Sequence, residues 1–280
     1  MSEISSFLTR ILTDLAAETG RFSVKTTSDG FLNILEFTDG TSINTFASHL
    51  GANSDAASAI AIDKVATSSL LETRGVAHIP HYLYYSSKMY SDEKQKLFEA
   101  VRAAFKIADL HDGQPAIVIK PNCGTSGRDV RLAHSEQEAT EIAEKVLVSN
   151  LSIAISPYYA AEAEYRCTYL NGEVRFLYRK IHTKDWRFNL HAGSASEVLD
   201  EKDPKYRDVV ELAIKAAKAI DINFAHIDIM EKDGQLAVLE INSAVTYAIF
   251  SKQHPECYDK LKSIYKDAID LIYNRRVSQS

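Results

Sequence analysis

Three oxygen-bearing side chains lie on a predicted hairpin late in the chain. In "FAHIDIMEKDGQLAVLEINS" the dipeptide Asp233-Gly234 separates two runs of alternating apolar and polar residues, which predicts antiparallel strands joined by a tight turn. Asp228 lies on the first strand, and Glu240 and Asn242 lie two apart on the second, so all three can share one face. Such oxygens suit Mg²⁺. The hairpin is a candidate magnesium site, although a solvated acidic face is the commoner meaning of the pattern.

A second candidate is a loop rich in glycine and hydroxyl residues. "PAIVIKP" predicts a short strand that ends at Lys120, and "NCGTSGRDV" follows it. Backbone N–H groups in such a loop can approach phosphate oxygens closely, and the lysine adds positive charge. Glycine and serine more often form a simple turn. The loop therefore gains meaning only in combination with the hairpins that follow it.

The elements that must position these residues are mixed helices and strands. A strand is expected in "FLNILEFTDG", and a second hairpin turns at Asn171-Gly172 between "EYRCTYL" and "EVRFLYRKI". Consecutive hairpins without regular βαβ alternation indicate an α+β fold. Apolar spacing and capping residues predict helices near residues 7–19, 54–75, 91–113, 205–220 and 255–274, and a further helix that begins at Ser135.

Composition limits the classes of function. The chain has 280 residues, 45% hydrophobic and 25% charged, which is typical of a globular protein with a sizeable core. Its net charge of −6 argues against nucleic-acid binding. Three cysteines without metal-ligand spacing fit a reducing compartment. No signal peptide or membrane-spanning run is recognisable, so we expect a cytoplasmic protein that does not act at a membrane.

In their order along the chain, five segments resemble the ATP-grasp superfamily. The resemblance is strongest to its carboxylate–amine ligase branch, which includes ribosomal-protein glutamate ligases, cyanophycin synthetases and glutathione-forming enzymes. It spans roughly residues 53–250. The segments are "AIDKVATSSLLETRGVAHIP", "VIKPNCGTSGRDV", "ISPYYAAEAEYR", "YRKIHTKDWRFNLHAG" and "HIDI…LEINS".

The resemblance implies a fold and a division of the chain. The expected fold is α+β, of the ATP-grasp type, with two α+β subdomains clasping ATP and a reduced N-terminal region. The expected units are a reduced N-terminal region at 1–52, a helical segment at 53–112, a lid subdomain with the glycine-rich loop at 113–157, and a C-terminal subdomain with the metal site at 158–280.

The resemblance also implies a role for each matching residue. Arg179, Arg187 and Asn189 would reach the transferred phosphoryl group and the substrate, and Asp228, Glu240 and Asn242 would hold two Mg²⁺ ions, for which Mn²⁺ could substitute. His226 shares the Asp228 face and is expected to be structural. The residues expected to bind ATP are Lys64, Lys120, Gly124, Thr125, Ser126, Gly127, Pro157, Tyr158, Tyr159 and Glu164.

The implied activity is an ATP-dependent ligase that joins a small-molecule or peptide carboxylate to an amine through an acylphosphate, releasing ADP and phosphate. A kinase of the same fold that phosphorylates a hydroxyl, and a nucleotide-binding module without turnover, are the alternatives. A homodimer is left open. Two departures concern the substrates: the region before the grasp is short, and "SAVTYAIF" follows Asn242 where the family often has small residues and a proline or glycine.

Overall fold

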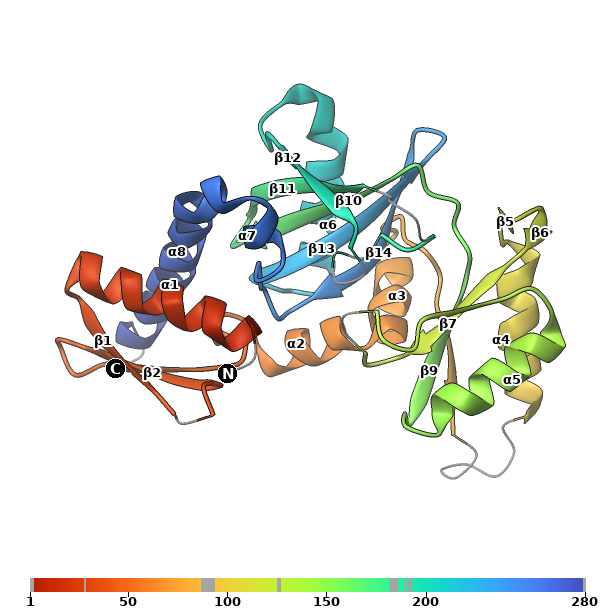
Figure 1. Ribbon diagram of the computed structural model, residues 1–280, viewed down its shortest axis with the longest axis horizontal. Helices are drawn as coiled ribbons and strands as arrows, with labels where there is room; N and C mark the ends of the chain where they lie inside the picture. Colours follow the sequence, from red (N-terminus) through yellow and green to blue (C-terminus); the bar gives the residue numbers. More distant parts are fainter. Residues whose placement is uncertain are drawn as a thin grey trace.

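The computed structural model describes residues 3–27, 29–86, 94–124, 127–181, 186–188, 190 and 193–278, with backbone alone for residues 3–6 and 94. Three groups of elements follow one another across the molecule, and the central group carries the largest sheet (Figure 1). No helix in these ranges is both long enough and apolar enough for a bilayer span. Helices and antiparallel sheets are mixed throughout, as the α+β prediction requires.

The N-terminal unit is a helix on a three-stranded meander. Helix α1 (Glu3–Thr19) ends where Gly20 adopts a positive φ of 62°, and antiparallel strands β1 (Phe22–Thr26), β2 (Leu32–Phe37) and β3 (Ser42–Phe46) follow. The apolar stripe of α1, which includes Ile11 and Leu15, packs in one core with the C-terminal helix α8 (Tyr258–Val277). The two ends of the chain therefore build a single unit (Figure 1).

The central unit is a five-stranded antiparallel sheet in the order β12-β11-β10-β13-β14. Its tight turns at Asn171-Gly172 and Asp233-Gly234 have positive φ at both residues, as the two predicted hairpins need. Helix α6 (Arg207–Ala219) covers one face of the sheet, and the opposite face looks into the pocket described below. The strands are β10 (Ala163–Leu170), β11 (Glu173–Ile181), β12 (Ala195–Leu199), β13 (Phe224–Lys232) and β14 (Gln235–Asn242).

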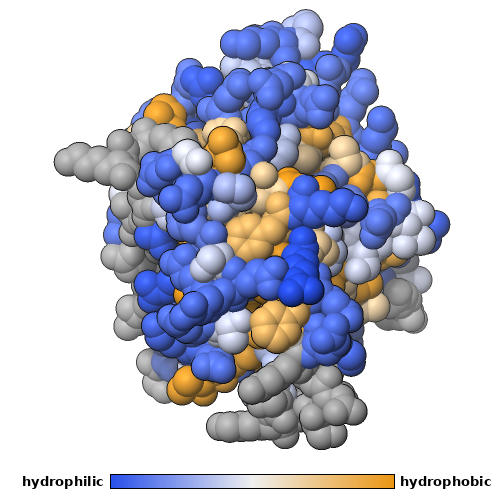
Figure 2. Space-filling model, turned by 90° about the vertical axis from the view of Figure 1, so that its right-hand side faces the viewer, coloured by the Kyte–Doolittle hydropathy of each residue, from blue (hydrophilic) through white to orange (hydrophobic). Residues whose placement is uncertain are grey.

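The lid unit is a four-stranded sheet in the order β4-β9-β7-β8, built from β4 (Tyr82–Tyr85), β9 (Ser152–Pro157), β7 (Ile117–Pro121) and β8 (Arg131–Ala133). Helices α4 (Lys94–Lys106) and α5 (Glu136–Leu147) share its apolar core. Ser135 caps α5, as predicted, by accepting from the Glu138 N–H at 3.1 Å. Seen from the lid side, the surface is mostly hydrophilic with apolar groups near its centre (Figure 2).

Two predicted helices have different bounds in the structure. The helix expected at 54–75 is broken at Asp63 into α2 (Asp55–Ile62) and α3 (Lys64–Thr73), because Asp63 is extended and its carboxylate caps the second helix at Ala66 N–H. The helix expected at 91–113 ends at Lys106, because Asp112-Gly113 turns the chain in the short hairpin of β5 (Leu110–His111) and β6 (Gln114–Pro115).

The expected helical segment at 53–112 does not form one unit. Helices α2 and α3 pack in the core of the central sheet, whereas β4 and α4 belong to the lid. The lid therefore begins near residue 82 and not at 113. Short elements not expected from the sequence include α7 (Phe250–Gln253) and two 3₁₀ turns, Pro204–Tyr206 and Pro255–Cys257.

Candidate active site

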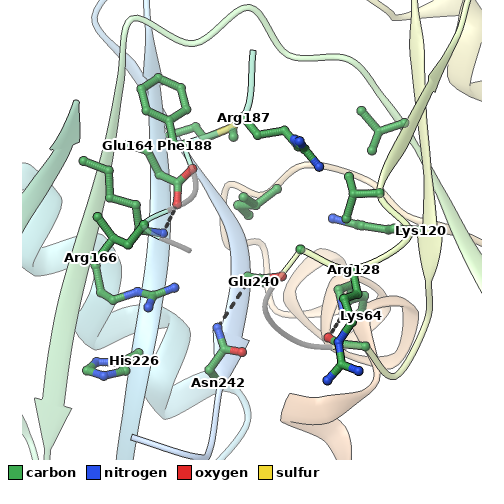
Figure 3. Close-up of a pocket in the computed structure, with 18 of the residues that line it drawn as sticks. Lys64, Lys120, Arg128, Glu164, Arg166, Arg187, Phe188, His226, Glu240 and Asn242 are labelled. Atoms are coloured by element: carbon green, nitrogen blue, oxygen red, sulfur yellow. Dashed lines mark hydrogen bonds and ion pairs between the residues drawn. The ribbon is translucent and has the colours of Figure 1, made fainter. Parts of the chain in front are cut away.

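A cavity of about 380 Å³ lies between the central sheet and the lid sheet. The open face of β10, β11, β13 and β14 forms one wall, and β7, β9, the glycine-bearing loop and the start of α3 form the other. Figure 3 shows Arg166 and His226 on the first wall and Lys64, Lys120 and Arg128 on the second, with Glu240 and Asn242 between them. Most of the predicted site residues thus meet at one place.

The lid wall concentrates positive charge. Lys64, Lys120 and Arg128 all line the cavity, and the first two are buried. Within the described ranges no carboxylate lies within 4.0 Å of any of these three cationic groups. Burial lowers the pKa of Lys120 to about 8, although Glu240 opposes the shift. This wall offers uncompensated cations to a ligand.

Lys64 is positioned by the break between α2 and α3. As the first residue of α3 it follows the capping Asp63, and its Nζ donates to the carbonyl oxygens of Gly124 at 2.8 Å and Asn122 at 3.2 Å. Asn122 in turn donates from Nδ2 to Asp63 at 2.7 Å and accepts from the Val65 N–H at 3.2 Å. The lysine, the helix start and the loop are therefore held as one assembly.

The glycine-bearing loop needs its glycines for two different reasons. A Cβ at Gly124 would lie 2.9 Å from Cβ of Pro121, so only glycine fits without a shift. Gly127 has a φ of 68°, which favours glycine. Both line the cavity. Thr125 and Ser126, predicted to contact phosphate, lie outside the described residues.

The hinge residues Pro157, Tyr158 and Tyr159 also line the cavity. The Tyr158 backbone is already engaged: its N–H donates to Ala116 O at 2.9 Å and its carbonyl accepts from Asp109 N–H at 3.0 Å. The Tyr159 N–H makes no backbone hydrogen bond in the described part of the chain. An adenine base bound at this end would therefore accept a hydrogen bond from the backbone N–H of Tyr159 and not from that of Tyr158.

The central wall carries a buried network of opposite charges. Arg166 on β10 grips Asp228 on β13 with two bonds, Nε to Oδ1 at 2.6 Å and Nη2 to Oδ2 at 2.5 Å. Lys180 on β11 lies 3.4 Å from the same carboxylate and contacts Glu164. All four side chains point to one face because Arg166 is the cross-strand partner of both Tyr178 and Asp228.

The network shifts the pKa of its members in opposite directions. Burial alone would raise the pKa of Asp228, but Arg166 and Lys180 lower it below its ordinary value. Burial raises the pKa of Glu164 to about 7, against the pull of Lys180. Burial, reinforced by Arg166, lowers the pKa of His226 to about 3. A neutral His226 fits its bonds, because Nδ1 accepts from Thr168 and Nε2 donates to Thr246 O, a structural role as predicted.

The predicted metal ligands divide between the cavity and this network. Glu240 and Asn242 line the cavity, and Asn242 Nδ2 donates to Glu240 at 3.2 Å. Asp228 is the cross-strand partner of Glu240, yet it is 1% exposed and is bound by Arg166. Oxygen donors from Glu240 and Asn242 suit Mg²⁺, which keeps several waters and needs few protein ligands. Among the described residues no cluster of three or more His, Cys, Asp or Glu side chains is arranged for a metal.

The structure contradicts the prediction for Arg179. Its cross-strand partner is Tyr165, which packs with the α6 core, so Arg179 lies on the face of β11 turned away from the cavity. There it pairs with Glu197 of β12 at 2.5 Å, with 40% of its side chain exposed. Side chains alternate along a strand, so the neighbouring Lys180 takes the inward position.

Arg187, predicted to reach the transferred phosphoryl group, lines the cavity, and Asn189 lies outside the described residues. The Arg187 guanidinium lies 5.9 Å from the Trp186 ring centroid and points toward the side of the cavity that holds Lys120 (Figure 3). Trp186 packs edge-on against Tyr158 and His111, at ring-centroid distances of 6.0 and 6.4 Å. Trp186 therefore contacts the hinge.

The sequence reading missed three cationic residues that line the cavity. Arg166 and Lys180 lie on the same face of the sheet as Glu164. The alternation of side chains along the hairpin that turns at Asn171-Gly172 could have predicted this. Arg128 follows Gly127 in the glycine-bearing loop, where a cation beside a phosphate-binding loop is a natural candidate.

Comparison with known families gives this geometry a context. The family model described as "RimK-like ATP-grasp domain" matches residues 83–257, more than half of the chain. The chain belongs to this ATP-grasp family. The match spans the lid sheet, the hinge and the hairpins that carry Arg166, Asp228, Glu240 and Asn242.

Relatives and solved structures agree with this family. A ribosomal protein bS6–L-glutamate ligase of Escherichia coli O1:K1 is 31% identical over 141 residues, which are 49% of this chain and 45% of that protein. A probable alpha-L-glutamate ligase of Maridesulfovibrio salexigens is 28% identical over 186 residues, 65% of this chain and 55% of that protein. The chain thus spans about half the length of these relatives.

A D-alanine–D-alanine ligase from Bacillus anthracis superposes with a TM-score of 0.60 at 20% identity, over 81% of this chain and 72% of that one. A structure of that ligase complexed with ATP gives a TM-score of 0.57 at 19% identity, over 81% and 71%. These likenesses establish the ATP-grasp fold, which confirms the fold that the five segments predicted.

Proposed function

We propose that this protein is an ATP-dependent carboxylate–amine ligase. One observation carries the proposal: cations without carboxylate partners on the lid wall face the oxygen donors Glu240 and Asn242 across a single cavity. Polyphosphate with Mg²⁺ needs this combination of positive charge and a few hard oxygen ligands. Family membership and the ligase names of the relatives support the same activity. None of the relatives or structures described above is named as a kinase.

Each part of the cavity has a proposed role toward ATP. Lys64, Lys120, Arg128 and the loop at Gly124–Gly127 would hold the phosphates, and Glu164 the ribose. The apolar end at Tyr158 and Tyr159 would hold the base. Glu240 and Asn242 would bind Mg²⁺, with Asp228 as a further ligand where the ion and Arg166 share its carboxylate. Bound there, Mg²⁺ would neutralise charge on the phosphate oxygens.

The proposed reaction has two steps. An oxygen of the substrate carboxylate attacks the γ-phosphorus of ATP, so the bond from phosphorus to the β-γ bridging oxygen breaks and ADP leaves. The amine nitrogen then attacks the acyl carbon, loses a proton and expels phosphate, leaving an amide. The lysines and Arg187 act electrostatically, by stabilising the charge that builds on the phosphoryl oxygens.

Water must be kept from the acylphosphate, which it would hydrolyse. Phe188 is 8% exposed and lies beside Glu164 at the roof of the cavity, and Trp186 packs on the hinge (Figure 3). We propose that these two rings close the base and ribose end of the cavity, which limits the entry of water to the reacting groups. The proposed substrates are a small-molecule or peptide carboxylate and an amine.

ADP and phosphate release with Mg-ATP tests the proposal across pooled amino acids and dipeptides, with mass spectrometry of the products. An amide lighter by one water than its two substrates combined is the expected product. Glu240→Gln should lower the rate at least about 100-fold, because it removes a charged oxygen ligand from the phosphate end. Glu197→Gln, on the outer face of the sheet, is the matched control and should turn over normally. A stable phosphorylated product, or full activity of Glu240→Gln, would contradict the ligase.

A further inference from the structure

Away from the hinge, the cavity has a charged part and an uncharged part. The phosphate end carries Lys64, Lys120 and Arg128, whereas the described lining residues that precede Lys64 or follow Asn242 in the sequence include no lysine, arginine, aspartate or glutamate. That far end, called here the substrate end, is formed by Ala47, Ser48 and His49 of the N-terminal unit and by Leu190, Ala244, Thr246, Ala248, Ile249 and Phe250. If ATP binds as proposed, the substrates would lie at this substrate end, beyond the γ-phosphate.

The substrate end is fixed in place by the surrounding fold. His226 Nε2 donates to the Thr246 carbonyl at 3.2 Å, which ties the segment after β14 to β13. Ala248 and Phe250 belong to the same buried core as α1, α8 and Leu50, so the N-terminal unit and this segment form one rigid wall. The N-terminal unit therefore supplies part of the cavity lining.

The titratable group of this end is uncharged at neutral pH. Burial lowers the pKa of His49, so its ring is neutral. Arg166 and Lys180 are committed to Asp228 and Glu164, and Arg187 points toward Lys120. Arg166 lies beside His226 (Figure 3) but is paired with Asp228, so an acidic side chain at the substrate end would lose its hydration without gaining an uncommitted counter-ion.

One polar group at this end has no partner. Ser48 lines the cavity with 5% exposure, and its Oγ makes no hydrogen bond in the described part of the protein. The other unpartnered buried side-chain atoms of the described residues belong to His81, His111, His134 and Ser243, and none of these residues lines the cavity. Buried hydroxyls are almost always bonded. Ser48 is thus suited to a ligand that brings the missing polar atom.

We infer that the substrate end binds an amino acid or peptide end with an uncharged aliphatic side chain, and that Ser48 bonds a polar main-chain atom of it. This inference rests on the proposed function for which end of the cavity holds substrate. It differs from the L-glutamate named for the relatives described above. The aliphatic side chain would contact Ala244, Ala248 and Ile249.

Calorimetric binding to the full chain with Mg²⁺ and a non-hydrolysable ATP analogue tests the inference. L-methionine, L-glutamine and L-glutamate are matched in length and differ in polarity and charge. Methionine should bind at least about tenfold more tightly than glutamate, because the apolar pocket leaves the carboxylate unpaired. Tighter or equal binding of glutamate, or no binding of any of the three, would overturn the inference.

Two serine variants separate ligand binding from folding. Ser48→Ala should weaken methionine binding about threefold to tenfold, the value of one hydrogen bond, without lowering the melting temperature. Ser243→Ala removes an equally buried unpartnered hydroxyl outside the cavity and should leave binding unchanged. Unchanged binding in Ser48→Ala would overturn the role of Ser48. Methionine binding without ADP release would sink the ligase and leave this inference standing, whereas amide formation from glutamate alone would do the reverse.

Discussion

The two walls of the cavity use their charged side chains differently. On the central wall Arg166 and Lys180 are neutralised by Asp228 and Glu164, and these four groups are largely buried. On the lid wall Lys120 has no ion-pair partner among the described residues, and Lys64 is bound to backbone carbonyls, which keep its charge. This paired network is therefore a neutral scaffold, from which Glu240 stands apart, and the lid wall projects positive charge toward a ligand.

The contrast follows from what each wall is built on. The central wall lies on paired strands, where cross-strand neighbours such as Arg166 and Asp228 are forced together and must compensate each other. The lid wall combines a strand end, a helix start and a glycine-bearing loop, so its cations come from separate elements with no carboxylate opposite. We expect loss of charge in the paired network of Arg166, Lys180, Asp228 and Glu164 to affect folding, and loss of charge on the lid wall to affect ATP binding.

Arg166→Met should show the largest effect on stability. It leaves Asp228, which is 1% exposed, with Lys180 as its remaining cation, so we expect a loss of about 3 kcal/mol in the free energy of unfolding. Arg179→Met is the matched control on the same sheet, with an exposed ion pair, and should cost less than about 1 kcal/mol. Urea unfolding of both variants measures the difference. Equal losses of unfolding free energy in the two variants would contradict the claim that the buried ion pair stabilises the fold more than the exposed one.

Lys120→Met should lower ATP affinity about tenfold to 100-fold while leaving the unfolding free energy unchanged or slightly higher. The variant removes charge-assisted hydrogen bonds to phosphate and also relieves the burial of an ammonium group. Lys106→Met, at the exposed end of α4, serves as the control for net charge. Calorimetric titration with ATP gives the affinities. A variant that bound ATP normally but unfolded easily would place Lys120 in the scaffold instead.

ATP affinity should fall at alkaline pH. Burial lowers the pKa of Lys120 to about 8, and bound phosphate favours the protonated amine, so binding is strongest below that pKa and weakens as pH rises through it. Above pH 8 we expect the dissociation constant to rise up to about tenfold per pH unit. Lys120→Arg keeps its charge and should flatten the profile between pH 7 and 9.5. A profile that is the same in the arginine variant would assign the titration to another group.

Much of the fold was readable from local signals. Asn171-Gly172 and Asp233-Gly234 set the two hairpins, and Ser135 opened its helix as expected, because turn and cap chemistry is decided within a few residues. The break at Asp63 carried a readable signal, since aspartate is a strong helix cap, but an unbroken apolar pattern hid it.

The site was predicted less completely because it depends on contacts between distant segments. Arg179 was predicted from its residue type. Leu177, two residues earlier, packs against α6, so Arg179 lies on the same face of the sheet, which is the face away from the cavity. The ion pair between Arg166 and Asp228 depends on the register of β10 against β13, which cannot be predicted from a local sequence pattern. The proposed role of Ser48 depends on the packing of the N-terminal unit against the segment after β14, which the sequence does not reveal.

The central claim is that a carboxylate is phosphorylated before an amide forms. The most direct measurement supplies the acid substrate with ¹⁸O in its carboxylate, together with Mg-ATP and the amine, and analyses the released phosphate by mass spectrometry. An acylphosphate transfers one carboxylate oxygen to phosphate, so we predict one ¹⁸O per phosphate for each amide made. Phosphate without ¹⁸O, or ¹⁸O retained in a stable phosphorylated product, would contradict the proposed reaction.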